Sequence, residues 1–479
     1  MARHQNGRAT QRIRRPSARG INRDTEDEIL EKNDYIHFES HSWPNPIVPG
    51  RAIGGLQAWR IIASIAAFFA KQHPSPDEIP MPAAPTSPAQ SATADTQGLI
   101  RLLTAGAGVS VACIYLNHPL LGLIGRDLDI APHALGVLPT LTAAGYASGI
   151  FFFGPLGDRY DRRLVILWKA VLLTLALIGS CVAPGLPMLA ASGFAIGLAA
   201  TIAQDFVPSA AAISTDLNRN RNIGTVMTGL LIGIVGSRVF SGIVADHFGW
   251  RAAFGVSAAA IVGLALAVRA AHFGVAPATR QPYFTLLRSL GTLFAQHPRL
   301  RASAFTQACL SVAFSGFWST VALHLTGTLG LSTGQAGLLG LAGAAGALGA
   351  SIAGRLSGRV APGHIVTGGA LLMAATFAAM ALFPHSLLAI VIGTLLFDMG
   401  VQAALVSHQT IIYALAPEAR SRINAVFMTI VFIGMSAGAY GASLAWSGGR
   451  WTGLMAFCTA TASIGLGLRL IFNARLGTR

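Results

Sequence analysis

Three ionisable side chains interrupt long apolar stretches of this chain: Asp205, Arg238 and Asp398. A charge at the depth of a lipid bilayer costs about 2.5 kcal/mol or more, so each one requires a reason. Carboxylates in such places take up and release protons, and a nearby arginine changes how readily they do so. We predict that Asp205 or Asp398 exchanges a proton, with Arg238 tuning it. A structural ion pair, or a carboxyl group satisfied between packed helices, explains the same residues and stays open.

The neighbours of these charges bear on that choice. Along the expected helices, Asp205 and Arg238 differ in height by roughly 8 Å, at about 1.5 Å per residue. The long arginine side chain can bridge that difference, although a direct ion pair is not assured. Asp398 has no basic residue near it in the sequence, which favours a functional role. Lys169 lies closer to a helix end, and we expect it to extend to the membrane surface.

A second chemically distinctive stretch runs from Gly154 to Arg163 and reads Gly-Pro-Leu-Gly-Asp-Arg-Tyr-Asp-Arg-Arg. Its small residues allow two helices to approach closely. Asp158 can cap the following helix or pair with a basic group. A loop that only sets topology would need no more than its arginines, Arg159, Arg162 and Arg163. That interpretation does not explain Gly154 and Asp158 at this spacing.

The elements that position these residues are long and apolar. Charged residues make up 11% of the 479 and hydrophobic residues 53%, whereas an ordinary soluble domain has about 25% charged residues. Twelve stretches are near the ~20 residues that a membrane-spanning helix needs. They cover residues 102–124, 133–156, 164–183, 187–213, 223–245, 252–270, 302–328, 333–356, 363–383, 386–413, 423–446 and 451–472. The sequence therefore predicts an all-α integral membrane protein.

Basic residues orient the chain. Seventeen arginines lie in or beside the loops on one side, against three on the other side, Arg126, Arg251 and Arg450. By the positive-inside rule both termini are expected in the cytoplasm, and the protein in the cytoplasmic (inner) membrane. The net charge of +15 does not indicate a nucleic-acid partner, because these residues lie in short loops between apolar segments.

The two halves of the apolar region match at a shift of 200 or 201 residues. Met227-Thr228 recurs as Met428-Thr429, Ile232-Gly233 as Ile433-Gly434, and Trp250 as Trp451. Two six-helix units of the same orientation are expected to surround a site near the membrane midplane. We expect six-helix bundles at 99–270 and 301–475, joined by a cytoplasmic linker at 271–300.

Residues 1–98 differ from the rest. Their charges, prolines and serines predict a disordered extension, and the one apolar run in it, 61–70, is too short to span a bilayer. Two interpretations stay open. The extension belongs to the native protein, or translation starts at Met81.

The Gly154–Arg163 run resembles the signature of the major facilitator superfamily, with Asp161 where that pattern has Gly. Other stretches resemble its drug or metabolite efflux branch: 115–121, 249–254 and 413–422. The resemblance implies twelve helices in two pseudo-symmetric six-helix bundles. It also implies transport by alternating access and a gating role for Gly154, Asp158, Arg159, Arg162 and Arg163. Proton-coupled efflux of a drug-like or metabolite solute is the expected function, although an antiporter motif is only weakly matched in 229–242.

The resemblance further implies that the first, fourth, seventh and tenth helices line a central cavity. Aromatic and amide side chains suit a mixed apolar pocket, although each one alone is more often a packing residue. The candidates on these helices are Tyr115, Asn117, His118, Gln204, Phe317, Trp318, His324 and Gln402. His408 is expected too close to the cytoplasmic end to take part.

Several alternatives remain open. A proton-coupled uptake symporter uses the same fold, and a non-transporting membrane receptor or a channel is a different class. An enzyme is not expected, since the chain shows no metal-ligand cluster, phosphate-binding glycine loop or nucleophilic serine motif. No cofactor is expected, with a proton gradient as the energy source. The expected partners are the solute and the lipid bilayer, and the protein is expected to act as a monomer.

Overall fold

The computed structural model describes residues 88–476, except for 216, 272, 275–278, 357–358 and 417–418. These residues belong to one of the two units of the chain, Arg51–Arg479; the other unit, Met1–Gly50, lies outside them. Met81 and most of the predicted disordered extension also lie outside. Helix α2 begins at Pro88, within the stretch expected to be disordered. Proline suits the first helical position, and the alanines that follow favour a helix.

Eleven helices in the described part of the chain are long and apolar enough to cross a membrane. The last of them, Arg420–Ala474, contains two predicted segments, because Arg450 breaks it with a non-helical conformation (φ 49°, ψ −133°). All twelve predicted segments are therefore present. Their boundaries differ from the expected ones by a few residues, as helix ends usually do.

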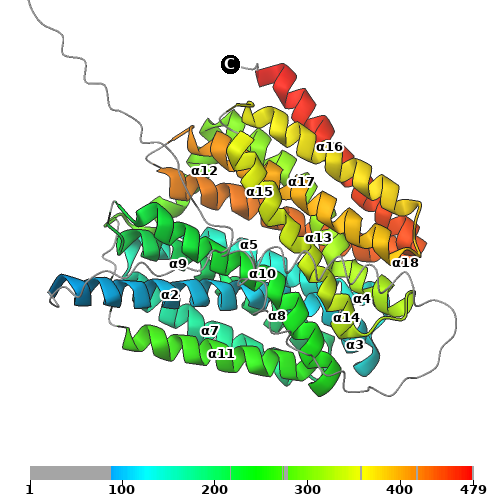
Figure 1. The fold of residues 1–479 in the computed structure, drawn as a ribbon, viewed down its shortest axis with the longest axis horizontal. Coiled ribbons are helices and arrows are strands. Elements are labelled where there is room, and N and C mark those ends of the chain that lie inside the picture. Colours follow the sequence, from blue (N-terminus) through cyan, green and yellow to red (C-terminus); the bar gives the residue numbers. More distant parts are fainter. Residues whose placement is uncertain are drawn as a thin grey trace, which may run out of the picture. The chain divides into compact units, whose positions relative to one another are not determined.

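Figure 1 shows how these helices are arranged. The first span consists of α2 (Pro88–Tyr115) and α3 (Asn117–Asp127), and the second of α4 (Pro132–Leu135), α5 (Val137–Phe153) and α6 (Leu156–Arg159). The third is α7 (Arg162–Cys181), the fourth α8 (Leu186–Ala200) with α9 (Ile202–Ala212), the fifth α10 (Arg219–Phe248) and the sixth α11 (Trp250–Ala270). After α12 (Tyr283–Gln296), the seventh span is α13 (Pro298–Gly327), and the eighth consists of α14 (Thr333–Leu338), η2 (Leu339–Ala344) and α15 (Ala345–Leu356). The ninth is α16 (Pro362–Ala381), the tenth α17 (Leu387–Tyr413), and α18 (Arg420–Leu476) holds the last two.

The helix packing repeats in the two halves. In the first half α2 packs on α10, α5 on α8, and α7 on α11; in the second, α13 packs on α18, α15 on α17, and α16 on α18. Across the halves, α5 packs on α18 and α10 packs on α14. The second span thus meets the eleventh, and the fifth meets the eighth, as a pseudo-two-fold relation between two six-helix bundles requires.

Matched residues of the sequence repeat have matched structural roles. A Cβ atom on Gly233 would lie 2.6 Å from Cα of Gly108, and one on Gly434 would lie 2.9 Å from Cα of Ala308. Glycine therefore allows the close approach of α2 to α10 and of α13 to α18. Gly249 and Arg450, which precede the matched tryptophans, both have positive φ, at 79° and 49°.

The connection between the halves contains a helix that the sequence pattern did not reveal. Helix α12 buries Leu286 and Leu290 and packs against α13 and α18. At its start, the hydroxyl group of Tyr283 donates a hydrogen bond to the carbonyl of Phe152 at 2.7 Å. Partial burial raises the pKa of Tyr283. The helix therefore contacts both halves.

Candidate functional site

Arg238 lies where the two halves meet. Its side chain extends from α10, and its Cζ atom is 4.9 Å from the ring centroid of Tyr115 on α2 and 4.1 Å from that of Trp318 on α13. A guanidinium group at these distances from two aromatic rings is stabilised by cation–π attraction. The residue is 3% exposed. Gly337 and Gly340 on the eighth span adjoin it, and a Cβ on Gly340 would lie 3.0 Å from its Cβ.

The hydrogen bonding of Arg238 is incomplete. Nη1 donates to the carbonyl of Ile234, one helical turn earlier, at 3.2 Å. Nε and Nη2 are buried and have no hydrogen-bond partner among the described residues. Buried donors are nearly always satisfied in folded proteins, so two free donors on one charged group call for an explanation.

Asp398 on α17 is the second buried charge at this place, also 3% exposed. A Cβ on Gly343 would lie 2.9 Å from its Oδ2 and 3.0 Å from Cζ2 of Trp318, so Gly343 leaves the room that both side chains occupy. The charges of Arg238 and Asp398 interact. Within the described residues, however, no hydrogen bond or ion pair joins the two side chains directly.

His118 completes the group. Its ring meets that of Tyr115 edge to face, with the centroids 5.5 Å apart, and it is near enough to feel the charge of Arg238. Its Nδ1 atom is buried without a partner in the described part of the chain. We call these five residues, Tyr115, His118, Arg238, Trp318 and Asp398, the central cluster. They come from both halves, and all of them were sequence candidates.

Two other cavity candidates contact protein side chains outside the central cluster. Gln204 donates a hydrogen bond to the hydroxyl group of Tyr146 at 2.9 Å. The ring of Phe317 lies 4.8 Å from that of Phe397, within the aromatic core of the second half. Phe317 therefore packs inside its own half, whereas Tyr146, the partner of Gln204, contacts Phe432 of the second half with the ring centroids 4.4 Å apart.

Of two further candidates, His324 lies apart from the central cluster, whereas Gln402 follows Asp398 on α17 by one helical turn. His324 donates a hydrogen bond from Nε2 to the carbonyl of Pro384 at 2.7 Å, and its ring stacks on Trp451 at 4.2 Å. Gln402 lies beside Gly346, whose Cβ would be 2.8 Å from its Cγ. His408, which we did not expect to take part, is fully buried and stacks on Phe427.

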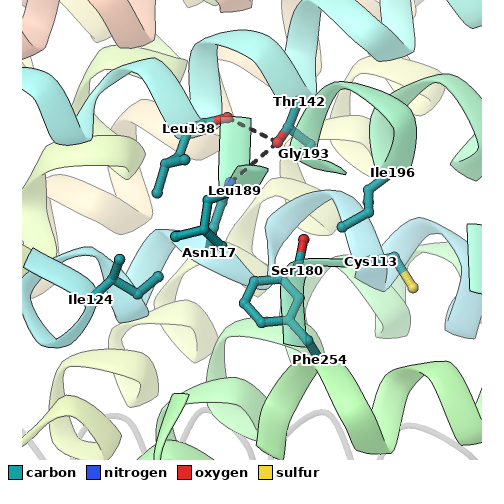
Figure 2. A pocket seen from close by; sticks show the side chains of 10 residues that line it. All are labelled: Cys113, Asn117, Ile124, Leu138, Thr142, Ser180, Leu189, Gly193, Ile196 and Phe254. Atoms are coloured by element: carbon teal, nitrogen blue, oxygen red, sulfur yellow. Dashed lines mark hydrogen bonds between the residues drawn. The ribbon is translucent and has the colours of Figure 1, made fainter. Parts of the chain in front are cut away.

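Asn117 lies in a pocket inside the first half, shown in Figure 2. Its Nδ2 donates to Thr142 Oγ1 at 3.2 Å, and that hydroxyl group donates to the carbonyl of Leu138 at 2.9 Å. The other lining residues are Cys113, Ile124, Ser180, Leu189, Gly193, Ile196 and Phe254. The pocket has room only for a water-sized molecule, so it is not a solute site.

Asp205 does not pair with Arg238. Its Oδ2 atom lies 2.6 Å from Nζ of Lys169, with 7% and 1% of the two side chains exposed. The expectation that Lys169 extends to the membrane surface is therefore wrong. Lys169 lies seven residues from the start of α7, and Asp205 lies seven from the end of α9, so they reach the same depth. The equal distances of the two residues from their helix ends can be counted in the sequence.

The signature-like run forms a tight turn. Arg162 binds Asp158 at 2.9 Å and donates from Nε to the carbonyl of Gly157 at 2.9 Å. Asp161 caps α7 by accepting a hydrogen bond from the backbone N–H of Arg163, and its φ is −56°. Glycine is not needed at this position, because an ordinary residue adopts that conformation.

The remaining residues of that run hold the turn in place. Gly154 ends α5. The guanidinium group of Arg163 donates to the carbonyls of Val268 and Arg269 at the end of α11. Arg159 lies in α6 with its guanidinium 5.4 Å from the ring of Tyr160. The turn is thereby tied to the sixth span.

The two halves are joined at one end, which we call the closed end. Asp246 at the end of α10 accepts hydrogen bonds from Ser332 Oγ and from the backbone N–H of Gly334, both at 2.7 Å. Ser443 on α18 donates to the carbonyl of His133 at 3.0 Å. Arg238 of the central cluster lies about two helical turns before Asp246 on α10.

The fold and the cluster between its halves define a multi-pass membrane transporter. Residues 103–439, and in a second match 303–476, fit the model of the Major Facilitator Superfamily. The chain belongs to this superfamily, and it is therefore not an enzyme.

Relatives and solved structures agree with this class. The chain is 36% identical to the uncharacterized transporter YgaY of Escherichia coli O157:H7, over 77% of this chain and 93% of that protein. A shorter match, 27% identical over 33% of this chain and 40% of the relative, is to the multidrug resistance protein MdtG of Escherichia fergusonii. A bacterial homologue of the human lysosomal transporter Spinster, in an inward-facing and occupied conformation, has the same fold. Its TM-score is 0.64 at 16% identity, over 81% of this chain and 98% of that one.

Proposed function

We propose that this protein is a secondary active transporter that moves a small solute by alternating access, driven by the proton gradient. The observation that carries the proposal is the central cluster, in which two buried charges, Arg238 and Asp398, come from opposite halves. The moving units are the bundles of residues 99–270 and 301–475, with 271–300 as the linker. The protein acts as a monomer in the cytoplasmic membrane.

The closed end supports alternating access. Asp246, Ser332 and Gly334 join the halves at this end through hydrogen bonds, which can break and re-form as access alternates. With both termini in the cytoplasm, as the arginine distribution predicts, the closed end faces the periplasm.

Asp398 is our candidate for the proton site. The groups that face Asp398 or its neighbour Arg238 are Tyr115, His118 and Trp318, and no lysine is among them. Asp205, in contrast, has its own lysine at 2.6 Å. A carboxylate in a direct ion pair binds a proton less readily than a carboxylate that has no cation directly bonded to it.

Export is the direction that we propose, supported by the efflux-like sequence stretches and by the likeness to a multidrug resistance protein. Uptake by symport is the second candidate, and one observation favours it. Protonation of Asp398 would release Arg238 from its only carboxylate neighbour in the described residues, leaving it free for an anionic solute. Proton and solute would then bind together, as symport requires.

Proteoliposomes with an imposed pH gradient test these proposals. The full chain, Asp398→Asn and Asp129→Asn are reconstituted separately, and internal pH is followed while small solutes are added. Asp129 is an exposed loop residue with a φ of 50°, which asparagine tolerates, so it is a matched control.

We expect solute-dependent proton flux with the wild type and Asp129→Asn, and roughly a tenfold or greater loss with Asp398→Asn. Proton movement opposite to the solute establishes export by exchange, whereas movement together establishes symport. Solute transport without proton flux, or undiminished flux in Asp398→Asn, overturns proton coupling through this residue.

A further inference from the structure

The two free donors of Arg238 lie on one edge of its guanidinium group. Nη1, which binds the carbonyl of Ile234, belongs to the other edge. Nε and Nη2 point in parallel, and this edge forms two parallel hydrogen bonds with a carboxylate in bidentate pairs. The unused part of Arg238 is therefore a complete fork rather than two unrelated donors.

The surroundings keep this fork charged and in place. Tyr115 and Trp318 contact the guanidinium group through their rings, which stabilises the cation but accepts none of its in-plane hydrogen bonds. Asp398 is close enough for its charge to act on Arg238, yet the two are not bonded. A purely structural arginine at 3% exposure would have its donors satisfied within the protein.

We propose that the Nε–Nη2 edge of Arg238 binds a carboxylate group of the transported solute. Tyr115 and Trp318 fix the plane of the guanidinium group and offer apolar ring surface to the rest of the solute. Solutes that carry only a positive charge are repelled by the same group. The inference rests on the proposed function and deepens it, because it assigns the solute to the organic acids.

Binding can be measured without transport. The full chain in lipid nanodiscs is titrated with matched small molecules at up to millimolar concentrations: benzoate, benzamide and benzylamine, then hexanoate and hexanamide. Each set holds the apolar body nearly constant and changes the polar group. Isothermal titration gives the dissociation constants for the wild type, Arg238→Gln, Arg238→Lys and Arg288→Gln. Arg288 is an exposed arginine on α12 and is the control.

The acids are expected to bind roughly tenfold or more tightly than their amides, because charge-assisted hydrogen bonds are the stronger ones. Arg238→Gln should lose this preference, Arg238→Lys should keep only part of it, and Arg288→Gln should bind like the wild type. Size-exclusion chromatography confirms that each variant is folded. Equal binding of amides or amines, undiminished acid binding by Arg238→Gln, or no binding of any acid overturns the proposal.

The result is separable from that of the proposed function. Acid-selective binding in a protein that moves no protons retains the site and rejects proton coupling. Proton-coupled transport of neutral or cationic solutes, unaffected by Arg238→Gln, retains the transporter and rejects the carboxylate site.

Discussion

Replacement of Lys169 by methionine should destabilise the protein strongly. The ammonium group of Lys169 lies 2.6 Å from the carboxylate of Asp205, and the side chains are 1% and 7% exposed. Methionine fills a similar volume, so the main loss is the charge that compensates Asp205. Removal of one partner from a buried ion pair costs about 3–5 kcal/mol, because the other charge is left buried alone. We expect a fall of that size in the free energy of unfolding.

The double variant Lys169→Met/Asp205→Asn makes the argument specific. With both charges removed, no buried ion is left uncompensated, and replacing a buried pair by neutral groups is often nearly neutral in stability. Most of the loss should therefore be recovered. The non-additivity of the double-mutant cycle should be about 2 kcal/mol or more.

Equilibrium unfolding in mixed detergent micelles measures these differences. Arg251 and Asp127 supply the control, since their ion pair has the same 2.6 Å separation but side chains that are 42% and 45% exposed. Arg251→Gln should cost no more than about 1 kcal/mol. If Lys169→Met costs no more than Arg251→Gln, or if the double variant is simply the sum of the single ones, the reasoning from burial is refuted.

Two further predictions concern the signature-like turn and the closed end. Asp161→Ala should cost about 1 kcal/mol in the same unfolding assay and Asp161→Gly only a few tenths, because Asp161 caps α7 at a negative φ; a larger loss with glycine than with alanine contradicts the capping role. Asp246→Ala removes the acceptor of two hydrogen bonds between the halves, worth about 1–3 kcal/mol. The distance between spin labels at His247 and Thr328 should therefore shift toward longer values, and an unchanged distribution would contradict this role of Asp246.

The spans were predictable because hydropathy and length act on the chain locally. Each apolar segment must satisfy its own backbone hydrogen bonds in lipid, so a helix of about 20 residues is nearly forced. The eleventh and twelfth spans were predicted as separate segments, because Gly448, Gly449 and the charged Arg450 interrupt the apolar run between them. The positive φ of Arg450 was not predictable, because a residue other than glycine seldom adopts it.

Side-chain partners were harder to predict because they depend on how helices rotate against each other. Depth along the span suggested Arg238 as a reachable partner of Asp205, and the structure selects Lys169 instead. The depths of Arg238 and Lys169 along their spans both lie within the reach of a long side chain from Asp205. Only the packing of α7 against α9 decides between them, and it is a tertiary property.

The cavity candidates divide for the same reason. Trp318 contacts Arg238 of the other half, whereas Phe317, its immediate neighbour, packs into the aromatic core of its own half. Adjacent residues on a helix point about 100° apart. Residue type alone therefore suggests a cavity position for both aromatic rings, and the rotation of α13 brings only Trp318 against Arg238 of the other half.

The two groups of buried charge differ in a way that fits their positions. Lys169 and Asp205 belong to one half and form a direct ion pair, which can persist while the halves move as rigid bodies. Arg238 and Asp398 belong to opposite halves, and within the described residues no hydrogen bond or ion pair joins them directly. A direct buried ion pair there would bind the halves together in one conformation and oppose every transition. Ligands shift a conformational equilibrium only through affinity that differs between its states. In the proposed function, the free hydrogen-bond donors of Arg238 at the junction of the halves provide that difference, because a solute can satisfy them in one arrangement more fully than in the other.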